Sequence, residues 1–126
     1  MPVSTTVALG DLRECLRVTD EYYSEVDLPF YRDKIADFIP DTVIDIHSHV
    51  TSPEEIKPEV PMETFWANRV CPNGMTLERL LQVHELMFPD KQLTPVVFPM
   101  PSSRLDIETG NAYLARDARK KGAIPL

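Results

Sequence analysis

The sequence is poor in cysteine, in glycine and in long apolar runs, and each shortage excludes a class of protein. Two cysteines, Cys15 and Cys71, in 126 residues are too few for a disulfide framework and are typical of a reducing, cytoplasmic compartment. No apolar run approaches the ~18 residues of a membrane span, and the first residues lack the basic and apolar regions of a signal peptide. Only 4 glycines stand against 12 prolines, so proline marks most of the predicted breaks between elements.

Basic residues are also in the minority, with 13 lysines and arginines against 20 acidic residues and a net charge of −7. This balance argues against a nucleic-acid or anionic-membrane surface, so we expect neither partner. With 43% apolar and 26% charged residues, the composition is that of a globular protein rather than a disordered one. The length suits one domain, yet it is about half of the roughly 250 residues of a (β/α)8 TIM barrel.

Residues 1–41 predict a helical N-terminal arm. Apolar residues recur at helical spacing over 8–18, which indicates an amphipathic helix. A second helix is predicted with Asp27 as its N-cap, Pro29 in its first turn, and Pro40 at its end. Two interpretations of the arm stay open: two surface helices packed on a larger body, or an arm through which the chain forms a homo-oligomer.

Residues 42–126 alternate strand and helix. The predicted order is a strand at 42–47, a long loop at 48–75, a helix at 76–88, a strand at 93–98, a helix at 109–121 and a third strand from 123. This order is typical of a parallel sheet with helices packed on it. We therefore expect an α/β fold that comprises the first two and a half β/α units of a TIM barrel. A buried parallel strand needs neighbours, so the chain is expected to be the amino-terminal fragment of a longer protein, or to close on a partner chain.

The segment with the most informative chemistry is the end of the first predicted strand. Regular alternation places Asp45, His47 and His49 on one face, and Ile44 and Ile46 on the other, where they would pack under helices. Two imidazoles at this spacing can converge on one divalent ion, because Zn–N bonds are about 2.0–2.1 Å long. His47 and His49 are therefore predicted metal ligands, with zinc as the preferred ion; Asp45 would orient a ligand or be satisfied internally.

The run Ile44-Asp45-Ile46-His47-Ser48-His49 follows a helical arm and precedes a long loop. In this layout it resembles the first strand of the amidohydrolase superfamily. The branch it is most similar to is the amidohydrolase-related metal-dependent hydrolases, which include the aminocarboxymuconate-semialdehyde decarboxylase type. The similarity covers about residues 20–126, and four other segments add to it: Phe65-Trp66, Cys71-Pro72-Asn73-Gly74-Met75-Thr76, Phe88-Pro89-Asp90-Lys91 and Val96-Val97-Phe98.

The resemblance implies a metal-dependent hydrolase that acts on an amide, lactone or ester of a small molecule, or that decarboxylates a metal-bound carboxylate. His47 and His49 would be its first two ligands, while the remaining ligands and the general base would come from later strands. This chain alone is therefore expected to be inactive. Two alternatives remain: a non-enzymatic, truncated or degenerate copy that acts as a binding module, and another His-x-His barrel enzyme, such as a PHP-type phosphoesterase or a TatD-type nuclease.

Three further residues are candidates for binding substrate. Trp66 and Arg69 lie in the long loop that would overhang the metal, and Arg104 follows the second strand at the same end. Arg104 could hold a substrate carboxylate with two hydrogen bonds, although a solvated loop arginine is the plainer interpretation. His84 falls on the apolar face of its predicted helix and is expected to be packed in the core.

Overall fold

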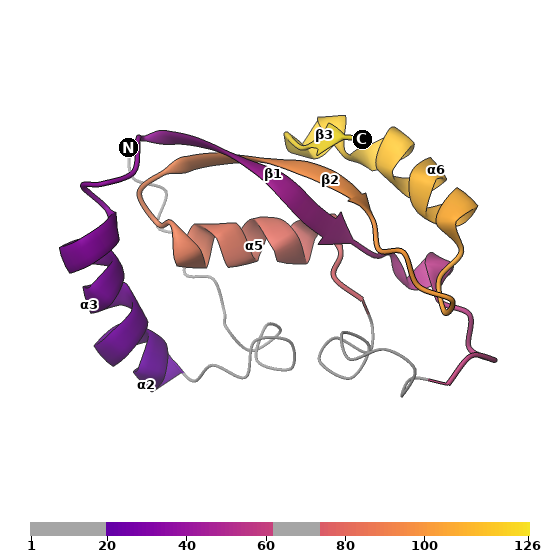
Figure 1. The fold of residues 1–126 in the computed structure, drawn as a ribbon, viewed down its shortest axis with the longest axis horizontal. Helices are drawn as coiled ribbons and strands as arrows, with labels where there is room; N and C mark the ends of the chain where they lie inside the picture. The colour runs from indigo at the N-terminus through magenta and orange to yellow at the C-terminus, as the bar shows by residue number, and fades with distance from the viewer. Residues whose placement is uncertain (1–19, 62–73) are drawn as a thin grey trace.

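The computed structural model describes residues 20–61 and 74–126, and these form a small α/β structure around a parallel sheet. Its strands are β1 (Thr42–Val50), β2 (Gln92–Pro99) and β3 (Ile124–Pro125), hydrogen-bonded in the order β1-β2-β3. The helix α5 (Leu77–Met87) connects β1 to β2, and α6 (Ile107–Asp117) connects β2 to β3 (Figure 1). The predicted α/β class and parallel sheet are therefore confirmed, whereas three strands are too few to close a barrel.

One hydrophobic core lies between the sheet and its two connecting helices. It joins side chains from β1, β2, α5, α6 and the connection from α6 to β3: Val50, Leu77, Leu80, Val97, Tyr113, Leu114, Ala118 and Ala123. The Tyr113 hydroxyl accepts a hydrogen bond from the backbone N–H of Leu77 at 3.1 Å, which ties α6 to the start of α5. Both helices thus cover the same face of the sheet.

The opposite face of the sheet carries the two isoleucines that were expected to pack under helices. Ile44 is 59% exposed and Ile46 is 77% exposed, so that prediction is wrong. The reason is that Asp45, which stands between them, faces α5 through His84, so both isoleucines lie on the opposite face. β1 also has a register shift between Asp45 and Ser48. It begins opposite Pro95, a residue that has no N–H to donate to the ladder and that sheets tolerate mainly at edges and bulges.

The helix α5 begins where the sequence predicts. Its N-cap is Thr76, whose side chain accepts the N–H of Arg79 at 3.3 Å. At its other end Met87 is 55% exposed.

The helix α6 starts two residues earlier than predicted, because the Asp106 carboxylate accepts the N–H of Thr109 at 2.8 Å and caps it there. Its buried face includes Tyr113 and Leu114. A single 3-10 turn, η6 (Arg119–Lys121), follows it and ends at Gly122, whose φ of +78° is a conformation that favours glycine.

The described part of the arm is one continuous helical segment: α2 (Asp20–Tyr22), η2 (Tyr23–Asp27), α3 (Leu28–Phe30) and η3 (Tyr31–Ile35). Asp27 has helical backbone angles and therefore does not begin a helix, contrary to the prediction. The turns on either side of Pro29 are π-helical; in the first of them the N–H of Leu28 bonds to the carbonyl of Tyr23, five residues back. The helix predicted at 8–18 lies outside the described residues.

Two tyrosines attach this segment to the far end of the sheet from α6 (Figure 1). Tyr31 is 6% exposed, packs edge-on against Phe88 at 6.0 Å between ring centroids, and donates its hydroxyl proton to Asp90. Tyr23 donates to the carbonyl of Leu86 at 2.8 Å.

The described helices are all too short or too polar to span a membrane.

Candidate metal centre at the end of β1

His47 and His49 lie together near the carboxyl end of β1. Their Nε2 atoms are 3.1 Å apart, and their rings meet at 72° with centroids separated by 5.0 Å. His47 is exposed and His49 is half-buried. The structure thus brings the two predicted ligands to one point on the face of the sheet opposite α5 and α6, which no described helix covers.

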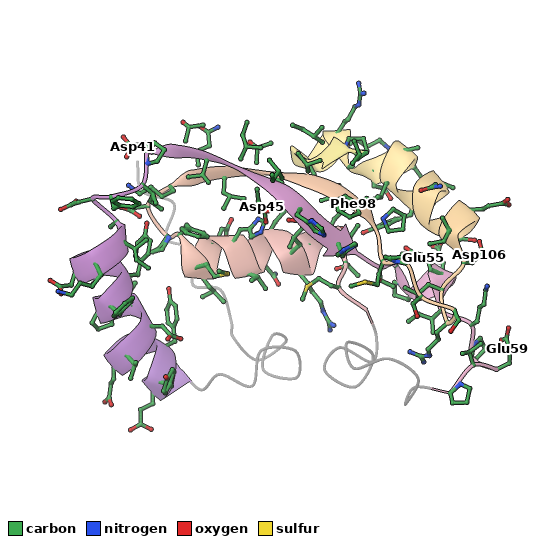
Figure 2. All side chains as sticks on the ribbon, viewed as in Figure 1. Asp41, Asp45, Glu55, Glu59, Phe98 and Asp106 are labelled. Carbon is green, nitrogen blue, oxygen red and sulfur yellow. The ribbon has the colours of Figure 1, made fainter. Side chains whose placement is uncertain are left out.

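A β-bulge puts both imidazoles on that face. Asp45 pairs with Pro95 and Ser48 pairs with Val97, so Ile46 and His47 together span an interval that a single residue spans on β2. The extra residue reverses the alternation of side chains along the strand. Asp45 consequently lies on the α5 side of the sheet (Figure 2), and the prediction that it shares a face with the histidines is wrong.

Phe98 of β2 forms one wall of the site and was not singled out in the sequence. It pairs with His49 in the register, and its ring centroid lies 4.5 Å from that of His49 and 5.0 Å from that of His47. Figure 2 shows Phe98 near the end of β2 that adjoins the tip of β1. Its position in the sequence could have indicated Phe98, because it lies at the carboxyl end of the second predicted strand, and the carboxyl ends of neighbouring parallel strands lie at the same edge of a sheet.

A backbone carbonyl orients the second imidazole. Nδ1 of His49 lies 3.2 Å from the carbonyl oxygen of Pro99, an acceptor, so the neutral ring carries its proton on Nδ1. Its Nε2 then offers a lone pair, which accepts a hydrogen bond from Nε2 of His47 when no ion is bound. Metal-binding histidines commonly have their second nitrogen fixed by a carbonyl or carboxylate in this way.

The nitrogen pair fits a divalent metal ion in distance and in chemistry. Two Zn–N bonds of about 2.05 Å span the 3.1 Å separation at an angle of about 100°, which suits tetrahedral or octahedral coordination. Imidazole nitrogen is a good ligand for zinc and its neighbours in the first transition series. Residues 20–61 and 74–126 contain no group of three or more histidine, cysteine, aspartate or glutamate side chains placed to hold a metal, so the candidate ligands among them are His47 and His49.

Beneath the strand, Asp45 and His84 form a polar contact that faces away from the two imidazoles. His84 Nε2 of α5 lies 3.4 Å from Asp45 Oδ2. Burial raises the pKa of Asp45, but hydrogen bonds from Ser48, from the backbone of His47 and from His84 outweigh it and lower the pKa below its usual value. Burial lowers the pKa of His84 against the opposing pull of Asp45, and so favours a neutral ring. The expectation that His84 is packed in the core is confirmed by its 8% exposure.

Arg104 lies in the connection between β2 and α6 and is only 8% exposed. Its N–H donates to Ser102 Oγ at 3.3 Å, and its carbonyl accepts the N–H of Lys57 at 2.8 Å. Its Nε is buried and has no hydrogen-bond partner among the described residues. It is therefore not the solvated loop arginine of the plainer interpretation. The other two predicted substrate residues, Trp66 and Arg69, lie outside the described residues, as do both cysteines.

Comparisons with known proteins identify no related protein for this chain. No family model matches the sequence, and neither the curated proteins nor the solved structures include a match to it.

Proposed function

We propose that His47 and His49 bind a divalent metal ion, with zinc preferred, in a metal-dependent hydrolase of the amidohydrolase type. The observation that carries this proposal is the pair of Nε2 atoms 3.1 Å apart, with His49 fixed through Nδ1 to the carbonyl of Pro99. A hydrogen-bonded pair of surface histidines could share the first feature. The carbonyl contact additionally directs a lone pair toward the shared point, as a ligand requires.

The reaction class follows from what such an ion contributes. A divalent ion supplies an acidic water near neutral pH and a Lewis acid for a carbonyl oxygen, which suits hydrolysis of a small amide, lactone or ester, or decarboxylation of a bound carboxylate. His47 and His49 would hold the ion, and Phe98 would shield their rings from water on one side. The general base and the remaining ligands would come from residues other than those described.

We propose further that the sheet is the first part of a TIM barrel. Its support is the asymmetry of the two faces: α5 and α6 cover one, whereas the other exposes Ile44 and Ile46 beside the two imidazoles. Parallel sheets are normally covered on both faces. In a barrel the uncovered face would be the interior, and the carboxyl ends of its strands would carry the active site.

Arg104 is proposed to bind a carboxylate of the substrate, together with Trp66 and Arg69 from the preceding loop. The support is confined to Arg104, a cation 8% exposed whose Nε has no partner among the described residues. A buried guanidinium without a carboxylate is costly, and an anionic ligand would relieve this.

We place the protein in the cytoplasm and expect any homo-oligomer to form through the arm.

A second candidate function is that of a non-catalytic binding module. The observation that favours it is that the described residues supply only two metal ligands. Such a module would bind metal weakly and would show no turnover.

The test of the metal site is equilibrium dialysis of the full chain against Zn²⁺, followed by metal analysis. We expect the wild type to bind one ion and both His47→Ala and His49→Ala to lose it. Ile46→Ala is the matched control, because Ile46 directly precedes His47 in the sequence and is 77% exposed; it should bind as the wild type does. Equal zinc content in all four proteins would refute the proposed site. Added metal that gives turnover of a lactone or ester would exclude the binding module.

A further inference from the structure

A polar network beneath β1 connects the bulge to α5. Its centre is the Asp45 carboxylate, which contacts His47 in the bulge, Ser48 just after it, and His84 of the helix. It lies on the α5 side of the strand, away from the imidazole pair, so the proposed chemistry leaves it without a role.

One carboxylate oxygen supports the bulge from within the strand. Asp45 Oδ1 accepts the backbone N–H of His47 at 3.0 Å. The extra residue of a bulge leaves the hydrogen-bond ladder between strands, and a short acidic side chain two residues earlier can replace the lost partner. The carboxylate thus fixes the backbone at the first ligand itself.

The other oxygen closes the bulge and anchors it to the helix layer. Asp45 Oδ2 accepts the Ser48 hydroxyl at 2.6 Å and lies 3.4 Å from His84 Nε2. Ser48 and His84 are 5% and 8% exposed, whereas the Asp45 side chain is 35% exposed, so the two partners are shielded from water while the carboxylate stays partly open to it. The Asp45 side chain therefore closes the segment from residue 45 to residue 48 through hydrogen bonds to His47 and Ser48.

The bulge decides which face carries the ligands. In a regular strand, His47 and His49 would share a face with Asp45, and this is the face that α5 covers. With the extra residue, Ser48 takes the helix side three positions after Asp45, and His49 pairs with Phe98 on the open side. We propose that Asp45, supported by Ser48 and His84, is a positioning residue that holds the bulge and thereby sets the separation of the two imidazoles. This proposal rests on the metal site proposed above.

The first measurement is zinc affinity by competition with a chromophoric chelator, on the full chain. Asp45→Ala should weaken zinc binding roughly 10- to 100-fold, the usual effect of removing a group that orients a metal ligand. Asp45→Asn should recover part of the loss, because its amide oxygen can still accept the N–H of His47. Asp41→Asn, an aspartate just before the same strand, is the matched control and should leave the affinity unchanged. A purely stabilising role predicts a lower Tm for Asp45→Ala with unaltered affinity, and that result would overturn the proposal.

A metal-free measurement separates this inference from the proposed function. In the wild type, nuclear Overhauser effects should connect the ring of Phe98 to the rings of both histidines; in Asp45→Ala the contact to His47 should be lost. If the wild type binds no zinc but the contact of Phe98 to His47 is still lost in Asp45→Ala, the metal site fails and the positioning role stands. If the contacts are the same in both proteins, the positioning role is refuted. Ser48→Ala, a milder change to the same network, serves if Asp45→Ala does not fold.

Discussion

At the scale of single residues, the three histidines of the chain occupy two environments with opposite consequences. His47 and His49 meet on the open face of the sheet, where an ion and a substrate could reach them. His84 is buried on the other side, its Nδ1 without a partner among the described residues and its Nε2 beside Asp45. Burial lowers the pKa of His84, which favours the neutral ring. One residue type therefore contributes the proposed ligands on one face and support for their strand on the other.

Glu55 is a second buried ionisable residue, and it gives a test of the electrostatics away from the metal site. It ends η4 (Pro53–Glu55), is 1% exposed, and accepts the N–H of Ser52 through Oε1 at 2.7 Å. Its Oε2 has no hydrogen-bond partner among the described residues, and α6 approaches so closely that a Cβ at Gly110 would lie 2.8 Å from it. Burial raises the pKa of Glu55, with hydrogen bonds from Ser52 opposing the effect.

A raised carboxyl pKa means that the folded state holds the proton more tightly than the unfolded state. Its stabilising effect is complete below the usual glutamate pKa and is lost as the pH rises through the folded-state pKa. We predict that Glu55→Gln, which stays neutral, gains stability relative to the wild type as the pH rises above about 4.5. Urea unfolding of both proteins between pH 4 and 8 checks this, and a difference that does not vary with pH would contradict it.

At the scale of elements, helix boundaries could be predicted where a single side chain sets them. Thr76 caps α5, and Gly122 ends the segment that follows α6 with its positive φ. The faces of β1 could not be predicted, because the bulge depends on which residue of β2 lies opposite. That residue is Pro95, and the pairing of β1 with β2 is not encoded in either strand alone. The arm helix was misplaced because Asp27 and Pro29 form a convincing helix start that the continuing helix overrides.

The cap of α5 gives a prediction about this element alone. Thr76→Ala removes the hydroxyl that accepts the N–H of Arg79 and should lower the free energy of unfolding by about 1 kcal/mol. Thr76→Ser keeps the hydroxyl and should cost much less. Chemical denaturation of the two variants beside the wild type measures the difference. An equal loss in both would indicate that the methyl group, rather than the cap, stabilises the helix.

At the scale of the whole molecule, Tyr31 is one of the two tyrosines that join the arm to the rest of the structure. Its hydroxyl bonds to Asp90, and burial followed by this hydrogen bond raises its pKa to about 12. Tyr31→Phe keeps the ring on Phe88 but removes the bond, and should destabilise the folded chain by about 1 kcal/mol. Amide hydrogen exchange over residues 28–35 should accelerate, while exchange in α6 stays unchanged. Uniform acceleration throughout would show that the arm and the sheet unfold as one cooperative unit.

The order of strands and helices was predictable because hydrophobic periodicity and proline breaks are local properties of the sequence. The convergence of His47 and His49 was predictable for the same reason, since residues two apart on a strand share a face whether or not a bulge precedes them. Phe98, Ser48 and the carbonyl of Pro99 complete the site through contacts between β1 and β2 or across the bulge, and spacing within one strand cannot reveal those.

The most direct test of the metal site is a zinc titration of the ¹⁵N-labelled chain, followed through long-range ¹H–¹⁵N correlations of its three imidazoles. Before zinc is added, His49 should show the tautomer protonated on Nδ1, because that nitrogen faces the carbonyl of Pro99. The account predicts that the Nε2 signals of His47 and His49 then shift together and saturate at one ion per chain, while those of buried His84 do not move. No shift, a shift of one ligand alone, or an equal shift of His84 would contradict it.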